Sequence, residues 1–159
     1  VDGRPADGLR RLQEAWPALR RSNLLRHALS GVDAGLLRAR VSLAVAARDP
    51  RRWPSLADLV ERDVAGIERR GGGHNSAHAS MLRANVAVQQ GDRATAAHLA
   101  RAAADAFVRH EMALHVAACG DLLEYCAGDR ATKLGLGRTT APDSDVPSRL
   151  LNPSLEATR

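Results

Sequence analysis

Aromatic residues are scarce in this chain of 159 residues, where Trp, Tyr and Phe together make up 3%. Few side chains are therefore available to stack on the bases of a single-stranded nucleic acid. Long apolar runs are absent too: no stretch approaches the roughly 18 apolar residues of a membrane span, and the first five residues lack the apolar segment of a secretory signal. No segment alternates apolar and polar residues over five positions, which excludes nucleotide-binding folds built on a parallel sheet.

Lysine is nearly missing, since Lys133 is the only one among 23 basic residues. The net charge of +5 and the sequence pI of about 10.4 are typical of proteins that bind nucleic acid. The arginines, however, are spread along the chain among Ala, Leu and Gly, a bias that a high-GC coding sequence alone would produce. A basic helical nucleic-acid-binding module is therefore kept only as an alternative.

Cysteine is limited to Cys119 and Cys126, which lie seven residues apart on one predicted helix. A helical rise of about 1.5 Å per residue separates their α-carbons by roughly 10 Å, whereas a disulfide spans less than about 7 Å. Free thiols packed in a core suit a reducing cytosol. We therefore expect a cytoplasmic protein in which these two thiols do not pair.

A pentapeptide, Gly-Asp-Arg-Ala-Thr, occurs at residues 91–95 and again at residues 128–132. Each copy follows a stretch with the pattern of an amphipathic helix. A Gly-Asp pair can end one helix on a left-handed residue and start the next on a side-chain cap. It is therefore the natural hinge of a repeated two-helix unit.

Apolar residues recur at three- and four-residue spacing along most of the chain, the pattern of helices with one buried face. We expect a kink at Ser30-Gly31 and a helix end at Asp49-Pro50, because a proline has no amide hydrogen and pushes the preceding residue out of the helical region. Residues 71–73, all glycine, predict a loop. The predicted helices span residues 5–22, 24–47, 54–69, 75–90, 93–110 and 112–127.

The predicted organisation is one all-α domain, residues 1–136, followed by a disordered C-terminal tail, residues 137–159. Residues 138–147 are rich in Thr, Ser, Asp and Pro and offer almost nothing to bury. The opening, residues 3–9, resembles the second half of a repeat whose first helix is missing, and the short continuation to Leu136 resembles a truncated last pair. We therefore expect a fragment of a longer protein.

The two-helix units resemble the tetratricopeptide repeat (TPR), whose period of about 34 residues lies near the 37 seen here. The small residues that this family places after the hinge glycine correspond to Ala96 and Ala103. The sequence departs from the family at Arg83, where a leucine is usual, and at Lys133, where a small residue is usual. The resemblance covers about residues 3–136 and implies a right-handed array of helical hairpins, an α-α superhelix.

The Arg/Ala-rich hairpins, with residues 14–19 and 24–27, resemble the C-terminal helical region of bacterial serine/threonine protein kinases. Similar arrays follow the ATPase modules of some bacterial transcription regulators, which is the alternative parent. Either resemblance implies a non-catalytic protein-protein interaction or regulatory module in signalling. No kinase core is present: five residues after Asp63, where a catalytic aspartate would be followed by asparagine, stands Glu68. We expect no enzymatic activity and no cofactor in this chain.

Candidate chemical sites are few. His74 and His78 have the spacing of a zinc-binding helix, but no glutamate lies between them and we place His74 in the glycine loop, so we predict no metal site. His110 and His115 bracket a turn without a nucleophile at triad spacing. The carboxylates around Arg62, at positions 58, 61 and 63, indicate a solvated helix face.

The TPR resemblance implies a more specific hypothesis than these chemical sites, a peptide-binding groove. In such arrays the first helices of successive pairs line a concave surface, with exposed positions about thirteen, ten, six and three residues before each hinge. The expected partner is a protein, a peptide or a neighbouring domain, and we expect neither a membrane nor nucleic acid. Ordinary polar helix faces are the alternative interpretation. The groove residues predicted in this way are Arg38, Ser42, His78, Asn85, His115 and Tyr125.

Overall fold

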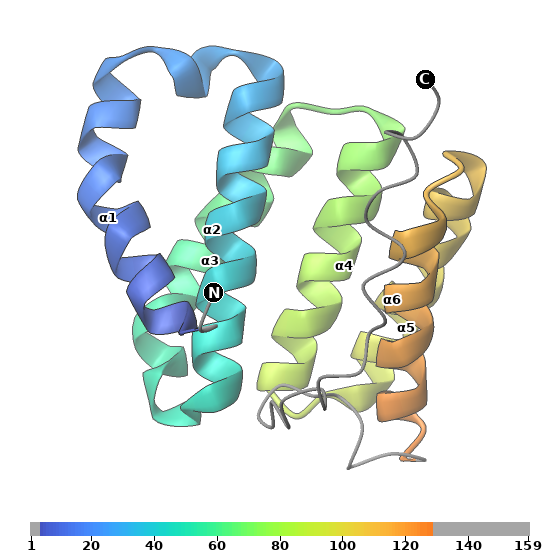
Figure 1. Cartoon of the computed structure of the whole chain (residues 1–159). Helices are drawn as coiled ribbons and strands as arrows, with labels where there is room; N and C mark the ends of the chain where they lie inside the picture. Colours follow the sequence, from blue (N-terminus) through green and yellow to red (C-terminus); the bar gives the residue numbers. More distant parts are fainter. Residues whose placement is uncertain (1–3, 129–159) are drawn as a thin grey trace, which may run out of the picture.

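The structure, a computed structural model, describes residues 4–128 (Figure 1). These residues form helices and turns and contain no strand, which confirms the predicted all-α class. The continuation to Leu136 and the expected tail, residues 137–159, lie outside the described part of the chain. The elements are α1 (Pro5–Arg21), a 3₁₀ turn (Leu24–Arg26), α2 (Ala28–Arg48), a second 3₁₀ turn (Pro50–Arg52), α3 (Trp53–Arg69), α4 (Gly73–Gln89), α5 (Arg93–Arg109) and α6 (Ala113–Cys126).

The helices pack in chain order, each against its neighbours in the sequence, and α2 also contacts α4. Figure 1 shows α2, α4 and α6 in front, with α3 behind α2, α5 behind α6, and α1 at the end of the row. Side-chain contacts join α4 to α6 as well, since the sulfur atoms of Met81 and Cys119 are 3.6 Å apart. The helices α2, α4 and α6 therefore lie side by side in one layer.

The apolar core consists of several clusters that together involve all six α-helices. One cluster joins α2, α3 and α4 around Val60, Val64 and Ile67, and others join α4, α5 and α6. Ala96 and Ala103, the small positions of the repeat, are fully buried, because small side chains let α5 approach its neighbours closely.

The first Gly-Asp hinge has the predicted geometry. Gly91 is left-handed (φ 79°), and the amides of Gly91 and Asp92 donate to the carbonyls of Val88 and Ala87 at 3.0 and 2.9 Å. The Asp92 carboxylate accepts a hydrogen bond from the Thr95 amide at 2.9 Å and caps α5. Gly128 at the second hinge is also left-handed (φ 83°), and the rest of that pentapeptide lies outside the described residues.

The start of α2 differs from the prediction of one helix over residues 24–47. The chain is extended at His27 (ψ 132°), between the first 3₁₀ turn and α2, and α2 is continuous through Ser30-Gly31. Gly31 has another role: a Cβ there would lie 2.5 Å from Arg70 Nη2, which donates to the Leu25 carbonyl at 2.8 Å. Glycine at position 31 therefore leaves room for the arginine that ties α3 to the 3₁₀ turn.

Glu111 gives a direct test of the turn between α5 and α6. It is left-handed (φ 55°), and the amides of Glu111 and Met112 repeat the hydrogen-bond pattern of the glycine hinge, donating to Val108 and Phe107. A side chain in this conformation costs roughly 1–2 kcal/mol. We therefore expect Glu111→Gly to raise the free energy of unfolding by about 1 kcal/mol in urea denaturation, after the entropy cost of glycine. The matched change Gly91→Ala should lower it, and a Glu111→Gly variant less stable than wild type would contradict this account.

Candidate functional site

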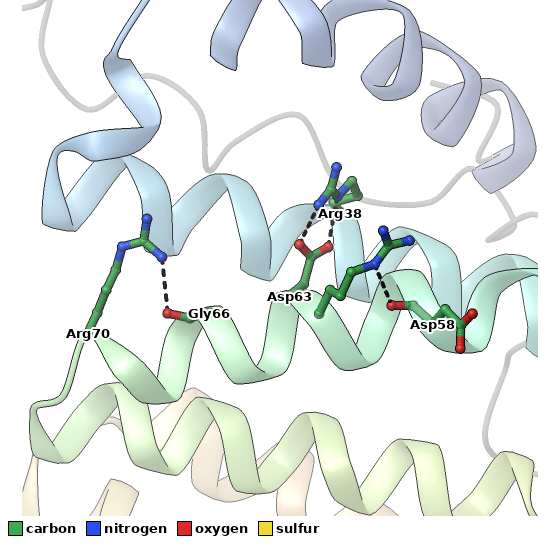
Figure 2. Close-up of polar contacts among 6 residues, drawn as sticks. Arg38, Asp58, Asp63, Gly66 and Arg70 are labelled. Carbon is green, nitrogen blue, oxygen red and sulfur yellow. Dashed lines mark hydrogen bonds and ion pairs between the residues drawn. The ribbon is translucent and has the colours of Figure 1, made fainter.

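Arg38, the first of the predicted groove residues, lies between helices instead of on a surface (Figure 2). Its guanidinium donates to both carboxylate oxygens of Asp63 on α3, at 2.8 and 2.5 Å, and stacks on Trp16 of α1, 3.3 Å from the ring centroid. Only 11% of the Arg38 side chain and 7% of the Asp63 side chain are exposed. Arg38 therefore ties three helices together through its ion pair with Asp63 and its contact with Trp16.

Ser42, also on α2, is fully buried, and its Oγ has no hydrogen-bond partner among the described residues. The placement of Arg38 and Ser42 in a groove thus differs from the structure. In the TPR family the groove positions are counted back from a hinge glycine. Here α2 ends at Arg48 and is followed by Asp49-Pro50, with no such glycine, so the count was made from the wrong residue. Asp63, expected on a solvated face, is buried by the same contacts.

The exposed side of α2 carries Asp33, Leu37 and Arg40, which sequence reasoning missed. Their spacing of four and three residues puts them on one side of the helix. The positive charge of Arg40 lowers the pKa of His78 of α4 and of His115 of α6, which links this side of α2 to the other two helices of the layer. Leu37, between the two charged residues, is 51% exposed. The signal available in the sequence was the spacing of the apolar residues Val32, Ala39 and Leu43, which are buried on the other side of α2.

The predicted positions Asn85 on α4 and Tyr125 on α6 are both partly open to solvent. Asn85 is half-buried and donates from Nδ2 to the Met81 carbonyl at 2.8 Å. Tyr125 is half-buried, with the guanidinium of Arg93 5.3 Å from its ring centroid. We call the surface of this layer of three helices the α2–α4–α6 face. Its exposed and half-buried members are Asp33, Leu37, Arg40, Met81, Asn85, Val88, His115, Ala118 and Tyr125.

Two of the predicted residues meet directly. The rings of His78 and His115 are 4.9 Å apart, centroid to centroid, and each lies about as close to Phe107 of α5, at 5.1 and 4.9 Å. His78 is 7% exposed, and its Nδ1 is buried without a hydrogen-bond partner among the described residues. Asn85, seven residues after His78 on α4, hydrogen-bonds instead to the Met81 carbonyl, so the predicted set divides into separate groups.

Burial, and then the nearby His115, Arg40 and His74, together lower the pKa of His78 to about 4, against the opposing effect of Asp33. Burial, and then Arg40, also lowers the pKa of His115. Both imidazoles are therefore neutral at neutral pH. Desolvation penalises the charged form of each ring.

His74 lies within α4, which begins at Gly73, and not in the glycine loop where we had placed it. Its ring is edge-on to that of His110 at 6.2 Å, and His110 packs against Gly73. Residues 4–128 hold no group of three or more His, Cys, Asp or Glu side chains that could bind a metal ion.

The two cysteines are unpaired, as their spacing predicted. Burial raises the pKa of both thiols, of Cys119 in the core and of half-buried Cys126. Raised pKa values keep these thiols protonated at neutral pH, so neither is an activated nucleophile.

Comparison of the sequence with protein-family models, with curated proteins and with solved structures finds no match. Within the described helices, none is long and apolar enough to cross a bilayer.

Proposed function

We propose that this chain is a non-catalytic protein-protein interaction module whose α2–α4–α6 face receives a peptide or a segment of a neighbouring domain. The observation that carries the proposal is Leu37, half exposed in the middle of that face between Asp33 and Arg40. The half-buried Met81, Val88 and Tyr125 extend the apolar area across α4 and α6. Apolar and aromatic side chains surrounded by polar ones are typical of protein interfaces.

We infer that the array is TPR-like and that the parent protein is a bacterial serine/threonine protein kinase in which this chain is a C-terminal regulatory region. The left-handed glycine hinge with its aspartate cap and the packing of α2, α4 and α6 in one layer support the first part. The second part depends on the sequence resemblance alone. The alternative parent is an ATPase-type transcription regulator.

The proposal predicts which substitutions abolish partner capture. The double variant Leu37→Glu, Arg40→Glu changes the face, whereas Arg101→Glu, Ala102→Glu makes the matched changes at exposed positions of α5. With immobilised chain as bait, we expect the first variant to lose at least about tenfold of the captured partner, since it buries carboxylates in an apolar contact. The second should capture as wild type does.

A different outcome would favour other functions. Capture that survives the Leu37 and Arg40 changes but is lost with those at Arg101 and Ala102 would contradict the proposed face. If the captured material is nucleic acid, and its binding weakens steeply with added salt, the basic nucleic-acid-binding alternative holds instead.

A further inference from the structure

Basic side chains from three helices converge on one part of the α2–α4–α6 face. His78 of α4 and His115 of α6 have ring centroids 4.9 Å apart. Arg40 of α2 lies within electrostatic range of both. These residues are far apart in the sequence, and the packing of the three helices alone brings them together.

His78 has a hydrogen-bonding atom that the fold leaves unused. Its side chain is 7% exposed, and Nδ1 has no partner among the described residues. Buried polar atoms without a partner are rare, and a bound water or ion is one explanation for them. The described part of the chain has two others, Ser42 Oγ and Asn75 Oδ1.

We propose that Arg40, His115 and His78 form a subsite that binds one acidic group, a carboxylate or a phosphoryl group, of the segment that occupies the α2–α4–α6 face. The inference rests on the proposed function, because it places the acidic group on the partner. Arg40 supplies a permanent positive charge and a planar set of donors that suits both kinds of anion. The two imidazoles, which lie against each other, supply further N–H donors.

Anion binding at this subsite should depend on pH. A bound anion favours the charged imidazole, so the pKa of the neighbouring rings should rise and binding should take up protons. The charged groups that act on His78 are Arg40 and Asp33 from α2, His74 from α4 and His115 from α6, while α5 contributes only the apolar ring of Phe107. Because Asp33 would repel the anion, Asp33→Asn should tighten binding.

Sulfate and acetate are suitable probes, because both stay fully ionised between pH 6 and 7.5 and they stand for a phosphoryl group and a carboxylate. We would follow the imidazole resonances of the full chain by NMR at constant ionic strength, with sodium chloride as the blank and the exposed His27 and His98 as references. We expect saturable shifts of the His78 and His115 signals that are stronger at pH 6. Arg40→Gln should weaken binding about tenfold. Arg11→Gln, the same change at an exposed position of α1, should leave it within about twofold.

The anion that saturates the His78 and His115 shifts at the lower concentration identifies the acidic group: sulfate indicates a phosphoryl group and acetate a carboxylate. Shifts that are no larger than those of His27 and His98, or that persist unchanged in Arg40→Gln, would overturn the subsite. If partner capture still depends on Leu37 in that case, the proposed function stands without the subsite. Saturable anion binding that needs Arg40, without any partner on the face, would support the subsite and remove the proposed function.

Discussion

Replacing Asp63 by alanine is expected to lower the free energy of unfolding by about 3–5 kcal/mol, because Arg38 would remain buried without its partner. The pair is nearly closed to solvent, and the guanidinium makes two hydrogen bonds to the carboxylate while it stacks on Trp16. A loss of this size is a large fraction of the roughly 5–15 kcal/mol that stabilises a domain. Urea denaturation followed by circular dichroism measures it.

The matched control is Asp58→Ala on the same helix. Asp58 is exposed, and it is its backbone carbonyl, not its carboxylate, that accepts a hydrogen bond from Arg62 (Figure 2). Its removal should change stability by less than about 0.5 kcal/mol. The double variant Arg38→Met, Asp63→Leu should be less damaging than Asp63→Ala alone, because no unpaired charge remains. Equal small losses in Asp63→Ala and Asp58→Ala would contradict the structural role assigned to Arg38.

Lowering the pH from 7.5 to 4.5 is expected to destabilise the protein through His78. The folded-state pKa of about 4 lies below the ordinary value of 6.5. Between these values the unfolded chain binds more protons than the folded one, so stability is fully present above pH 6.5 and falls as the pH decreases toward 4. The slope reaches up to roughly 1.4 kcal/mol per pH unit, which gives a total on the order of 2 kcal/mol at pH 4.5.

The comparison that isolates this effect is between wild type and His78→Leu, which cannot titrate and is close in size. Other groups also titrate in this range, so the quantity of interest is the difference between the two pH profiles of unfolding free energy. The unfolding free energy of wild type minus that of His78→Leu should decrease as the pH falls. Only wild type must either bury a charged imidazole or release the imidazole proton when it folds. His98→Leu, at an exposed position, should follow the wild-type profile. Parallel profiles for wild type and His78→Leu would show that His78 is not held neutral by the fold.

Local features of this fold could be predicted from the sequence. The positions of the helices follow from apolar spacing, and the hinge at Gly91-Asp92 follows from backbone chemistry that involves only adjacent residues. Even the unpaired state of Cys119 and Cys126 followed from helical rise alone.

Features that depend on contacts between distant residues could not be predicted from the sequence. Helical spacing from Val60 and Ile67 puts Asp63 on the buried side of α3, but its partner Arg38 is 25 residues away and cannot be identified from the local sequence. The exposed positions of α2 were predicted wrongly because this helix is followed by a proline turn, and the family's spacing is counted from a glycine hinge. His78 and His115 were both predicted for one surface, but their contact and the nearby Arg40 result from the packing of three helices.

Site-specific photo-crosslinking tests most directly whether the α2–α4–α6 face is the interaction surface. A photoreactive benzoylphenylalanine replaces Leu37 on this face or, as a control, Ala102 on the exposed side of α5, in cells that make the whole protein containing this chain. Our account predicts a covalent adduct with a protein, or with another segment of the same protein, from position 37 and none from position 102. Adducts from position 102 with none from position 37 would contradict it.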